Sequence, residues 1–542
     1  MYLFSPETYQ CPVRDGRGDT EQARFGAARE LRLLRPLTPM RQVEHAPLNC
    51  PRMTTPHLSP LLSLAPPHGD FDPAVLEAGV AQILALFRRL HDEGALPPVL
   101  SQVAPGAIAA QLAPTAPAVG ESLAAILADI ERIIVPGITH WHHPSFFAYF
   151  ANSSSVPSLL GEFLTSGLNA NAMLWVTSPA ATELEQRVLE WLWTAMGLPD
   201  AALWFGIITD TASMSTMLAL AAAREHAGLD IRRRGMAGRA DLPVLRVYCT
   251  SHTHSSVAKA CITLGIGSDN VVAVPVDRDF RMRVDALDSA LAADRSAGMR
   301  PLAVVATIGT TSTSSIDPVP AIADVCTREK VWLHIDAAYG GVMGIAPEYR
   351  WVLDGVDRAD SVVTNPHKWL FTTMDCSALW TRHPDVLRNA FSLVAEYLVT
   401  ARDSEVVNYM DYGVQLGRRF RALKLWMVMR AFGTDGLASR LRDHCTMARE
   451  FAARIDADAA WTLSAPVPFS LICFRYAPSG MSDTEADAKN AAMLATVNAR
   501  GKVYLSHTRL DGRYVLRLAI GNILTAHGHV ALAWDELQRA AQ

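Results

Sequence analysis

A lysine stands in an unusually apolar part of the sequence, between His367 and Trp369 in the segment TNPHKWLFTTMDC. Lysine side chains are rarely buried unless they are paired or used. In a pocket that holds little water the pKa of Lys368 would fall, and a neutral amine can attack a carbonyl to form a Schiff base. For a lone lysine, a surface position beside a loop is the favoured alternative.

An aspartate 32 residues upstream favours the functional interpretation of Lys368 over a surface position. Asp336 ends the apolar run VWLHIDAA, where an unpaired carboxylate would be unfavourable. It therefore needs hydrogen-bond donors or a cationic partner, and a protonated pyridine nitrogen that makes its ring an electron sink is such a partner. An ordinary acid that makes a turn at the end of a strand is the alternative.

Two hydroxyl-rich segments could bind a phosphate group. TDTASMSTMLALAAAREH places Thr211, Ala212 and Ser213 just before a predicted helix, whose first N–H groups bind anions well. GTTSTSSIDP, which contains Thr311, offers more hydroxyls. The alternatives are a helix cap and a polar loop. His254 in SHTHSSV could stack on a flat ring or cap the following helix.

Other catalytic and binding motifs are weak or missing. GIGSDN lacks the third glycine of the dinucleotide fingerprint, and neither a phosphate-binding G-x-x-x-x-G-K-[ST] loop nor a G-x-S-x-G elbow is present. The sequence contains no H-E-x-x-H pattern and no partnering cysteine or carboxylate spacing, so no metal is expected.

The polar segments follow short apolar runs that alternate with helical patterns. Strands are predicted at 244–251, 271–276, 301–309, 331–338 and 361–366, and helices at 254–267, 284–298 and 317–330. This alternation is typical of βαβ units and of a mostly parallel, buried sheet. Ligands bind beyond the carboxyl ends of such strands, where TSHTH, GTTSTSS, DAAYGG and NPHK are placed.

The sequence predicts four parts in the chain. Residues 1–52 are arginine-rich with little hydrophobic rhythm and are predicted to be a disordered extension, since their acids argue against a transit peptide. Residues 53–155 contain two predicted helices that lack a core of their own, and they are predicted to form an N-terminal helical arm and dimerisation segment. Residues 156–433 are predicted to be the large cofactor-binding domain, and 434–542 a small α+β domain.

The composition of the 542 residues is that of an ordinary globular protein, with 50% hydrophobic and 19% charged residues. A net charge of −5 gives no support for a nucleic-acid partner. The sequence contains no uncharged apolar run of about 18 residues, so no membrane span is predicted. The eight cysteines show no disulfide or zinc spacing, so a reducing, cytoplasmic setting is expected.

Taken together, HIDAAYGG and NPHKW strongly resemble the pyridoxal-phosphate-dependent (group II) decarboxylases related to aromatic-L-amino-acid decarboxylase. HWHHPSFFAYF, SPAATELE, SHTHSSV, ATIGTTS, DPVPAIA, DCSALW and LGRRFRALKLW follow the family's order. The resemblance covers the chain from about Asp70 to its end. It implies the fold type I of aspartate aminotransferase, an α/β fold with a mostly parallel seven-stranded sheet and a small α+β C-terminal domain.

The resemblance also implies roles for individual residues around pyridoxal 5'-phosphate. Lys368 would bind the cofactor as a Schiff base, Asp336 would pair with the ring nitrogen, and His254 and Ala338 would pack on its two faces. Ala212, Ser213 and Asn365 would hold the phosphate, and Thr211, Thr311 and His367 would complete the cofactor shell. A substrate amino acid would displace Lys368, lose its carboxylate as carbon dioxide and be protonated at Cα.

In the family, the proton comes from a tyrosine on a mobile loop. Counting back from LGRRFR assigns this role to Tyr409; Tyr412, or a mere packing role for Tyr409, is the alternative. Related aldehyde synthases replace either this tyrosine or the stacking histidine. Both are present at the assigned positions, so simple decarboxylation is favoured over an oxidative aldehyde synthase.

The substrate pocket departs in part from the aromatic-specific members. Trp141, Tyr149 and Phe150 keep the aromatic wall, which favours tryptophan, tyrosine, phenylalanine or dihydroxyphenylalanine, although core packing is always an alternative for aromatics. The departures are Asn152, Asn171 and Met173, at positions that border the pocket or come from a neighbouring subunit, so histidine or an acidic substrate stays open.

Arg517 matches an arginine that binds substrate carboxylate in related glutamate decarboxylases. A structural salt bridge is its equally weighted alternative. The resemblance further implies a homodimer with the active site at the interface.

Overall fold

The computed structural model describes residues 72–91, 96–393, 402 and 405–542. The predicted disordered extension, 1–52, and the start of the predicted arm, 53–71, lie outside the described residues. Residues 74–542 form one compact unit. The two helices of the predicted arm are present as α2 (Pro73–Leu90) and α3 (Leu123–Asp129), and α3 continues through a π-helical turn to Gly137.

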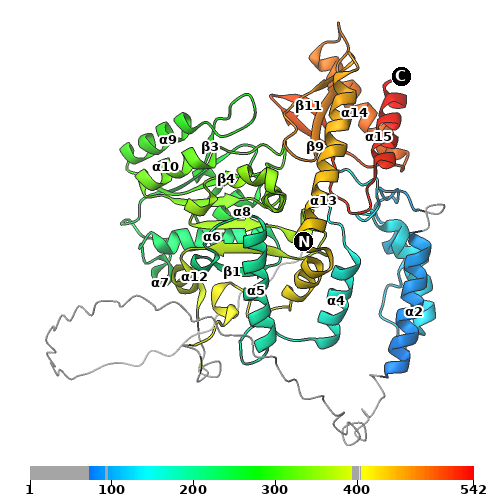
Figure 1. The fold of residues 1–542 in the computed structure, drawn as a ribbon, viewed down its shortest axis with the longest axis horizontal. Coiled ribbons are helices and arrows are strands. Elements are labelled where there is room, and N and C mark those ends of the chain that lie inside the picture. The colour runs from blue at the N-terminus through cyan, green and yellow to red at the C-terminus, as the bar shows by residue number, and fades with distance from the viewer. Residues whose placement is uncertain (1–71, 92–95, 394–401, 403–404) are drawn as a thin grey trace, which may run out of the picture. The chain divides into compact units, whose positions relative to one another are not determined.

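A seven-stranded sheet with the order β1-β7-β6-β5-β4-β2-β3 forms the centre of this unit (Figure 1). Strands β2 to β6 pair in parallel, and β7 pairs antiparallel with both β1 and β6. The expected fold, a mostly parallel sheet, is therefore confirmed. The strands are β1 (Phe205–Thr209), β2 (Leu245–Thr250), β3 (Val271–Val274), β4 (Arg300–Thr307), β5 (Trp332–Asp336), β6 (Ser361–Thr364) and β7 (Ser377–Thr381).

Helices cover both faces of the sheet, as the near-continuous apolar strands require. Alternate residues of β4 show this: Val304 and Ala306 belong to one hydrophobic core, whereas Ala303 and Val305 belong to another. The first core includes residues of α5, α9, α10 and α13, and the second includes residues of α6 and α8. The helices of this region are α4 (Val156–Leu168), α5 (Pro179–Ala195), α6 (Ala212–His226), α7 (Ile231–Arg234), α8 (Ser256–Thr263), α9 (Val284–Ser296), α10 (Val319–Glu329), α11 (Pro366–Trp369) and α12 (Pro384–Phe391).

A long helix leads from this region into a second, antiparallel sheet. Helix α13 (Ala422–Asp456) is interrupted at Gly433, whose φ of +61° suits a residue without a Cβ. The four-stranded sheet has the order β10-β11-β9-β8 and packs on α13, α14 and α15 through a separate core (Figure 1). Its elements are β8 (Trp461–Leu463), β9 (Leu471–Tyr476), α14 (Asp483–Ala499), β10 (Ser506–Leu510), β11 (Arg513–Ala519) and α15 (His527–Ala541). The kink falls where the domain boundary at 433/434 was predicted, and that boundary stays a prediction.

The parallel strands direct their polar carboxyl ends to one edge of the large sheet. Asp336 is the last residue of β5, and α11 with Lys368 follows β6 after one residue. The TSHTH segment follows β2, and the GTTSTSS segment follows β4. The fold therefore brings the predicted chemical groups to the edge where ligands bind in sheets of this class.

Candidate active site

A cavity of about 300 Å³ lies at this edge of the sheet. Its lining includes most of the predicted site residues: Trp141, Tyr149, Phe150, Asn152, Thr211, Ala212, Ser213, His254, Thr311, Asp336, Ala338, Asn365, His367, Lys368 and Arg517. These residues come from segments far apart in the sequence, including the small-domain strand β11. The structure thus gathers the lysine, the acid and the helix terminus into one site.

Lys368 projects from α11 against a stack of aromatic rings. Its Nζ lies 5.5 Å from the centre of the Phe150 ring. Phe150 stacks on Tyr339 at 3.7 Å between ring centroids, and Tyr339 stacks on Trp369 at 4.6 Å. Desolvation by these surroundings lowers the pKa of Lys368, although the carboxylate of Asp336 acts in the opposite direction. A neutral, nucleophilic amine is therefore easier to form here than in water.

Asp336 is a buried carboxylate, 4% exposed, that faces the same cavity. Its Oδ1 accepts a hydrogen bond from the backbone N–H of Ala338 at 3.1 Å. Among the residues that the structure describes, it forms no ion pair, and its second oxygen has no hydrogen-bond partner. An ionised acid in such a place needs a positive partner, and a protonated ring nitrogen of a ligand meets that need.

The first residues of α6 line one end of the cavity. Thr211 is the N-cap, with extended backbone angles, and its side chain makes no capping hydrogen bond. The first backbone bond into the helix comes from the N–H of Met214, which donates to the carbonyl of Thr211 at 3.0 Å. The N–H groups of Ala212 and Ser213 are therefore free for a ligand. With the helix dipole behind them, they suit a phosphate.

Two histidines of the cavity have ring orientations fixed by the backbone. Nδ1 of His367 accepts a hydrogen bond from the N–H of Cys376 at 3.0 Å, and Nδ1 of His254 accepts one from the N–H of Ser256 at 3.1 Å. Burial lowers the pKa of His367 to about 3, and burial together with the charge of Lys368 lowers the pKa of His254. The His367 ring is therefore neutral at pH 7 and carries its proton on Nε2.

Arg517 brings a buried cation from β11 to the cavity wall. Its Nε and Nη2 donate to the carbonyls of Ser312 (3.0 Å) and Thr311 (2.7 Å), and Nη1 donates to Oγ of Ser506 (2.8 Å). The side chain is 4% exposed and forms no ion pair with any described residue. Of its five N–H groups two have no such partner. The salt-bridge alternative thus has no counterpart among the described residues, and a buried cation of this kind suits an anionic ligand group.

Tyr409 does not reach this cavity. It lies in a short 3-10 helix (Tyr409–Tyr412), is 1% exposed, and donates from its hydroxyl to the carbonyl of Gly206 at 3.2 Å. The guanidinium of Arg418 lies 4.5 Å from its ring centre. Burial raises the pKa of Tyr409 well above its usual value. In the described chain Tyr409 therefore packs against the sheet, and its alternative, Tyr412, stacks on Phe205.

Asn171 and Met173 also lie outside the cavity. Asn171 is exposed, and its Oδ1 accepts a hydrogen bond from the N–H of Arg418 at 3.0 Å. Met173 packs against Leu174 and Met410. A single chain does not bring these two residues to Lys368, so a contribution to a partner's pocket stays a prediction.

Four further residues line the cavity without having been predicted: Thr307, Gly309, Tyr339 and Met374. Thr307 ends β4, and Tyr339 and Met374 belong to the DAAYGG and TTMDC segments. The rule that sites form at strand ends could have identified Thr307 and Gly309. Nothing in the sequence distinguishes Met374. In the structure its sulfur lies 3.5 Å from Nδ2 of Asn152.

The residues of the cavity fit pyridoxal phosphate. A nucleophilic lysine, a buried acid with a free oxygen and the unpartnered N–H groups of a helix N-terminus face one space. They match the three polar functions of that cofactor: its aldehyde, its ring nitrogen and its phosphate. Lys368, Asp336, Ala212 and Ser213 would therefore hold it, with His254 beside the ring.

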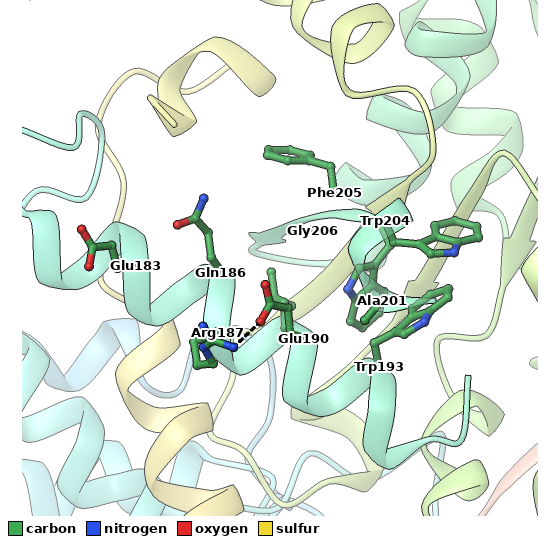
Figure 2. A pocket seen from close by; sticks show the side chains of 11 residues that line it. Glu183, Gln186, Arg187, Glu190, Trp193, Ala201, Trp204, Phe205 and Gly206 are labelled. Carbon is green, nitrogen blue, oxygen red and sulfur yellow. Dashed lines mark ion pairs between the residues drawn. The ribbon is translucent and has the colours of Figure 1, made fainter. Parts of the chain in front are cut away.

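A second cavity, of about 390 Å³, lies beside α5 and the start of β1, and Figure 2 shows it from close by. Its acids are already engaged: Glu190 pairs with Arg187 at 2.8 Å, and Glu183 accepts a hydrogen bond from Nε1 of Trp175 at 2.9 Å. None of the described residues that line it is a lysine or a histidine. We therefore assign the chemistry to the cavity of Lys368.

Comparison with known proteins gives the same picture. Residues 105–477 match the family described as the pyridoxal-dependent decarboxylase conserved domain. The chain is 41% identical to tyrosine decarboxylase 2 of Arabidopsis thaliana over 84% of either chain, and 40% identical to phenylacetaldehyde synthase of the same species over 82% of this chain and 91% of that one. The crystal structure of Oryza sativa TDC with PLP and tryptamine superposes with a TM-score of 0.83 at 35% identity, covering 87% of this chain and 98% of the other.

Proposed function

The chain belongs to the pyridoxal-dependent decarboxylase family, and we propose on that premise that it converts an aromatic L-amino acid to its amine and carbon dioxide. It is a pyridoxal-phosphate-dependent amino acid decarboxylase by family and fold. The observation that carries the proposal is the shared cavity of Lys368, Asp336 and the N-terminus of α6, with aromatic side chains and Arg517 on its wall.

Bound pyridoxal phosphate supplies a protonated ring that withdraws electrons from the bond between Cα and the carboxylate of the substrate. Asp336 would keep the proton on the ring nitrogen, because this acid is buried and forms no ion pair with any described residue. Lys368 would hold the cofactor through its amine, whose pKa the surroundings of the cavity lower. His254 would lie beside the ring, and the N–H groups of Ala212 and Ser213 would anchor the phosphate.

The aromatic wall of the cavity supports an aromatic substrate. Trp141 and Tyr149 stack at 5.7 Å between ring centroids, and the ring centre of Phe150, which also lines the cavity, lies 5.5 Å from Nζ of Lys368. Tyr149 has a φ of +53°, a strained conformation for a bulky residue that is often found at functional sites. Its hydroxyl lies 3.1 Å from that of Tyr504. Asn152 adds a polar group to the lining, so a substrate ring with a polar group, such as a phenol, a catechol or an imidazole, stays compatible with the cavity.

The substrate class can be tested with the purified protein reconstituted with the cofactor. Tryptophan, tyrosine, phenylalanine, dihydroxyphenylalanine, histidine and glutamate would each be supplied, and carbon dioxide and organic products measured. We expect release of carbon dioxide and amine from at least one aromatic substrate, at a kcat/KM at least about tenfold above that for glutamate. A preference for histidine or glutamate would contradict the aromatic assignment but leave the decarboxylase class intact.

We expect Arg517→Lys to raise the KM of the preferred amino acid by about 10- to 100-fold, with a smaller change in kcat. Lysine keeps the positive charge but lacks the planar guanidinium. In Arg517 that group donates to the carbonyls of Thr311 and Ser312 and still has two N–H groups for a substrate carboxylate. Steady-state kinetics on each variant measure this. Arg513→Lys on the same strand is the matched control, because Arg513 is exposed and lies outside the cavity. An unchanged KM in Arg517→Lys would remove Arg517 from the substrate site.

An oxidative aldehyde synthase is the second candidate function. The specific observation in its favour is that Tyr409, the assigned proton donor, does not reach the cavity, and a 40%-identical relative is a phenylacetaldehyde synthase. Such an enzyme forms aldehyde, ammonia and hydrogen peroxide. A coupled peroxide assay distinguishes the two, since amine as the only organic product eliminates the synthase.

We expect Tyr409→Phe to lower the free energy of unfolding by about 1 kcal/mol and to leave the product unchanged. The substitution removes the hydrogen bond to the Gly206 carbonyl but keeps the ring in its buried site. Urea unfolding and product analysis on the same samples measure both effects, and Tyr412→Phe is the matched control. A switch of Tyr409→Phe from amine to aldehyde would instead establish Tyr409 as the proton donor.

We further propose a homodimer with the site near its interface. Helix α4 exposes Val156 (69%), Leu160 (52%), Phe163 (52%) and Leu168 (64%). An exposed apolar patch of this kind usually marks a protein–protein contact. Sedimentation equilibrium should give twice the chain mass of 59.0 kDa, and Phe163→Asp should lower that mass toward the monomer.

A reducing, cytoplasmic location is proposed on two findings. The six cysteines in the described part of the chain are all buried and unpaired. No helix among the described residues is both long and apolar enough to cross a membrane. Free buried thiols are typical of proteins in a reducing compartment. Cell fractionation of the native host would test the proposal.

A further inference from the structure

Three hydroxyl groups form a buried chain that leads to Asn365 at the cavity. Oγ1 of Thr209 lies 2.8 Å from Oγ of Ser215, which lies 3.0 Å from Oγ of Ser377, which donates to Oδ1 of Asn365 at 2.7 Å. Ser215 and Ser377 are completely buried, and neither lines the cavity.

The fold explains why these groups meet. Thr209, the last residue of β1, and Ser377, the first residue of β7, are directly opposite each other in the antiparallel register. Ser215 lies in the first turn of α6, the helix whose N-terminus lines one end of the cavity. Asn365 caps α11, which carries Lys368. The chain therefore connects the phosphate end of the site with the segment of the lysine.

The amide of Asn365 sets the direction of the whole chain. Its Oδ1 can only accept, so the hydroxyl of Ser377 must donate to it. The single proton of Ser377 is then used, and Ser215 must donate to Ser377; by the same reasoning Thr209 donates to Ser215. The hydroxyl proton of Thr209 then points to Ser215 and not to the carbonyl of Thr211, which lies farther away, 3.2 Å from Oγ1.

This direction leaves the N–H₂ group of Asn365 for the cavity. Asn365 lines the cavity, and its Nδ2 has no hydrogen-bond partner among the residues in the described ranges. A phosphate has only acceptor oxygens, so it can be bound by the amide nitrogen but not by the amide oxygen. If the amide were reversed, its oxygen would face the phosphate.

We propose that Ser377, supported by Ser215, is a positioning residue that holds the Asn365 amide with its N–H₂ group toward the cofactor phosphate. The inference rests on the proposed phosphate site but adds residues that touch neither cofactor nor substrate. Without the Ser377 hydroxyl, the amide oxygen loses its hydrogen-bond donor. The amide group can then flip, so that its oxygen and not its nitrogen faces the phosphate. Ser377 thereby contributes to affinity for the phosphate end of the cofactor and not for its ring.

The test compares cofactor binding with and without the phosphate. Apoenzyme of the wild type, Ser377→Ala and Ser215→Ala would be titrated with pyridoxal phosphate and with pyridoxal, and dissociation constants measured by absorbance and fluorescence. We expect Ser377→Ala to weaken pyridoxal phosphate about 5- to 10-fold, Ser215→Ala about 2- to 3-fold, and both to leave pyridoxal unchanged. Ser215→Ala has the smaller effect because Ser377 can still donate to Asn365.

Thr381→Val is the matched control, because it removes a buried hydroxyl from the other end of β7. It should leave both dissociation constants unchanged. Equal weakening of pyridoxal phosphate and pyridoxal in Ser377→Ala, or no weakening of either, would overturn the proposal. If Ser377→Ala does not fold, a Ser215→Ala protein that binds both ligands like the wild type would overturn it as well. Failure of the wild type to bind pyridoxal phosphate would instead contradict the proposed function.

Discussion

Replacement of Lys368 by alanine is expected to lower kcat by at least about 10⁴-fold, equivalent to ~5 kcal/mol of barrier. The lysine is the only amine that the described cavity lining offers to the cofactor aldehyde. Its low-water surroundings, with the Phe150 ring 5.5 Å from Nζ, lower its pKa and make it nucleophilic. Decarboxylation assays and borohydride reduction of the loaded protein, followed by peptide mass mapping, measure both consequences.

The matched control for this experiment is Lys259→Ala. Lys259 is exposed on α8, close enough to influence the pKa of His254, but it does not line the cavity. It should keep the wild-type rate within about threefold and should leave the covalent label on Lys368. A label that persists in Lys368→Ala, or a rate reduced by less than about tenfold, would show that another group carries the cofactor.

Asp336→Asn is expected to lower kcat by about 10³-fold, or ~4 kcal/mol, while the protein still folds. The amide has nearly the same shape but no charge, so the ring nitrogen of the cofactor loses the group that keeps it protonated. Since Asp336 is 4% exposed and its only described hydrogen bond comes from the N–H of Ala338, little else in the fold depends on its charge. Assays at saturating cofactor separate this effect from weaker cofactor binding.

Two companion variants define the origin of the loss. Asp336→Glu keeps the charge but shifts it by one methylene, and it should recover part of the rate. Asp360→Asn removes a different acid, one that accepts the N–H of Leu333 at 2.7 Å and pairs with His383 outside the cavity. It should lower stability but leave kcat within about threefold. Equal activity of Asp336→Asn and the wild type would exclude the proposed role of the carboxylate.

The central strands of the large sheet could be predicted from the sequence because they are buried on both faces. Such strands read as short Val/Ile/Leu runs between helical patterns, as at β4 and β5. The edge strand β1 and its neighbour β7 were not predicted. β1 and α6 lie in one largely apolar region, separated only by Asp210 and Thr211, and β7 follows the lysine segment without a clear turn signal. Their antiparallel pairing depends on contacts between residues more than 160 positions apart, such as Thr209 with Ser377.

The candidate site divides in the same way. Lys368 and Asp336 could be predicted because they lie at the carboxyl ends of predicted strands, which a parallel sheet brings to one edge. The start of α6 could be predicted because hydroxyl residues precede a helical pattern. Tyr409 was assigned by counting along the chain from the LGRRFR segment. The structure buries it against Gly206 and Arg418, because linear spacing does not state which face of the sheet a loop residue meets.

The sequence by itself determined the class of chemistry: a lysine among apolar residues, an acid at a strand end and a helix start suited to phosphate are local patterns with local physical causes. Only the tertiary structure decided how these groups are oriented. It showed that Arg517 is a buried cation without a described counterion, and that Oδ1 of Asn365 accepts a hydrogen bond at the end of a chain of hydroxyls from β1, α6 and β7. Burial and hydrogen-bond direction depend on neighbours from distant parts of the chain, so they exist only once the sheet has formed.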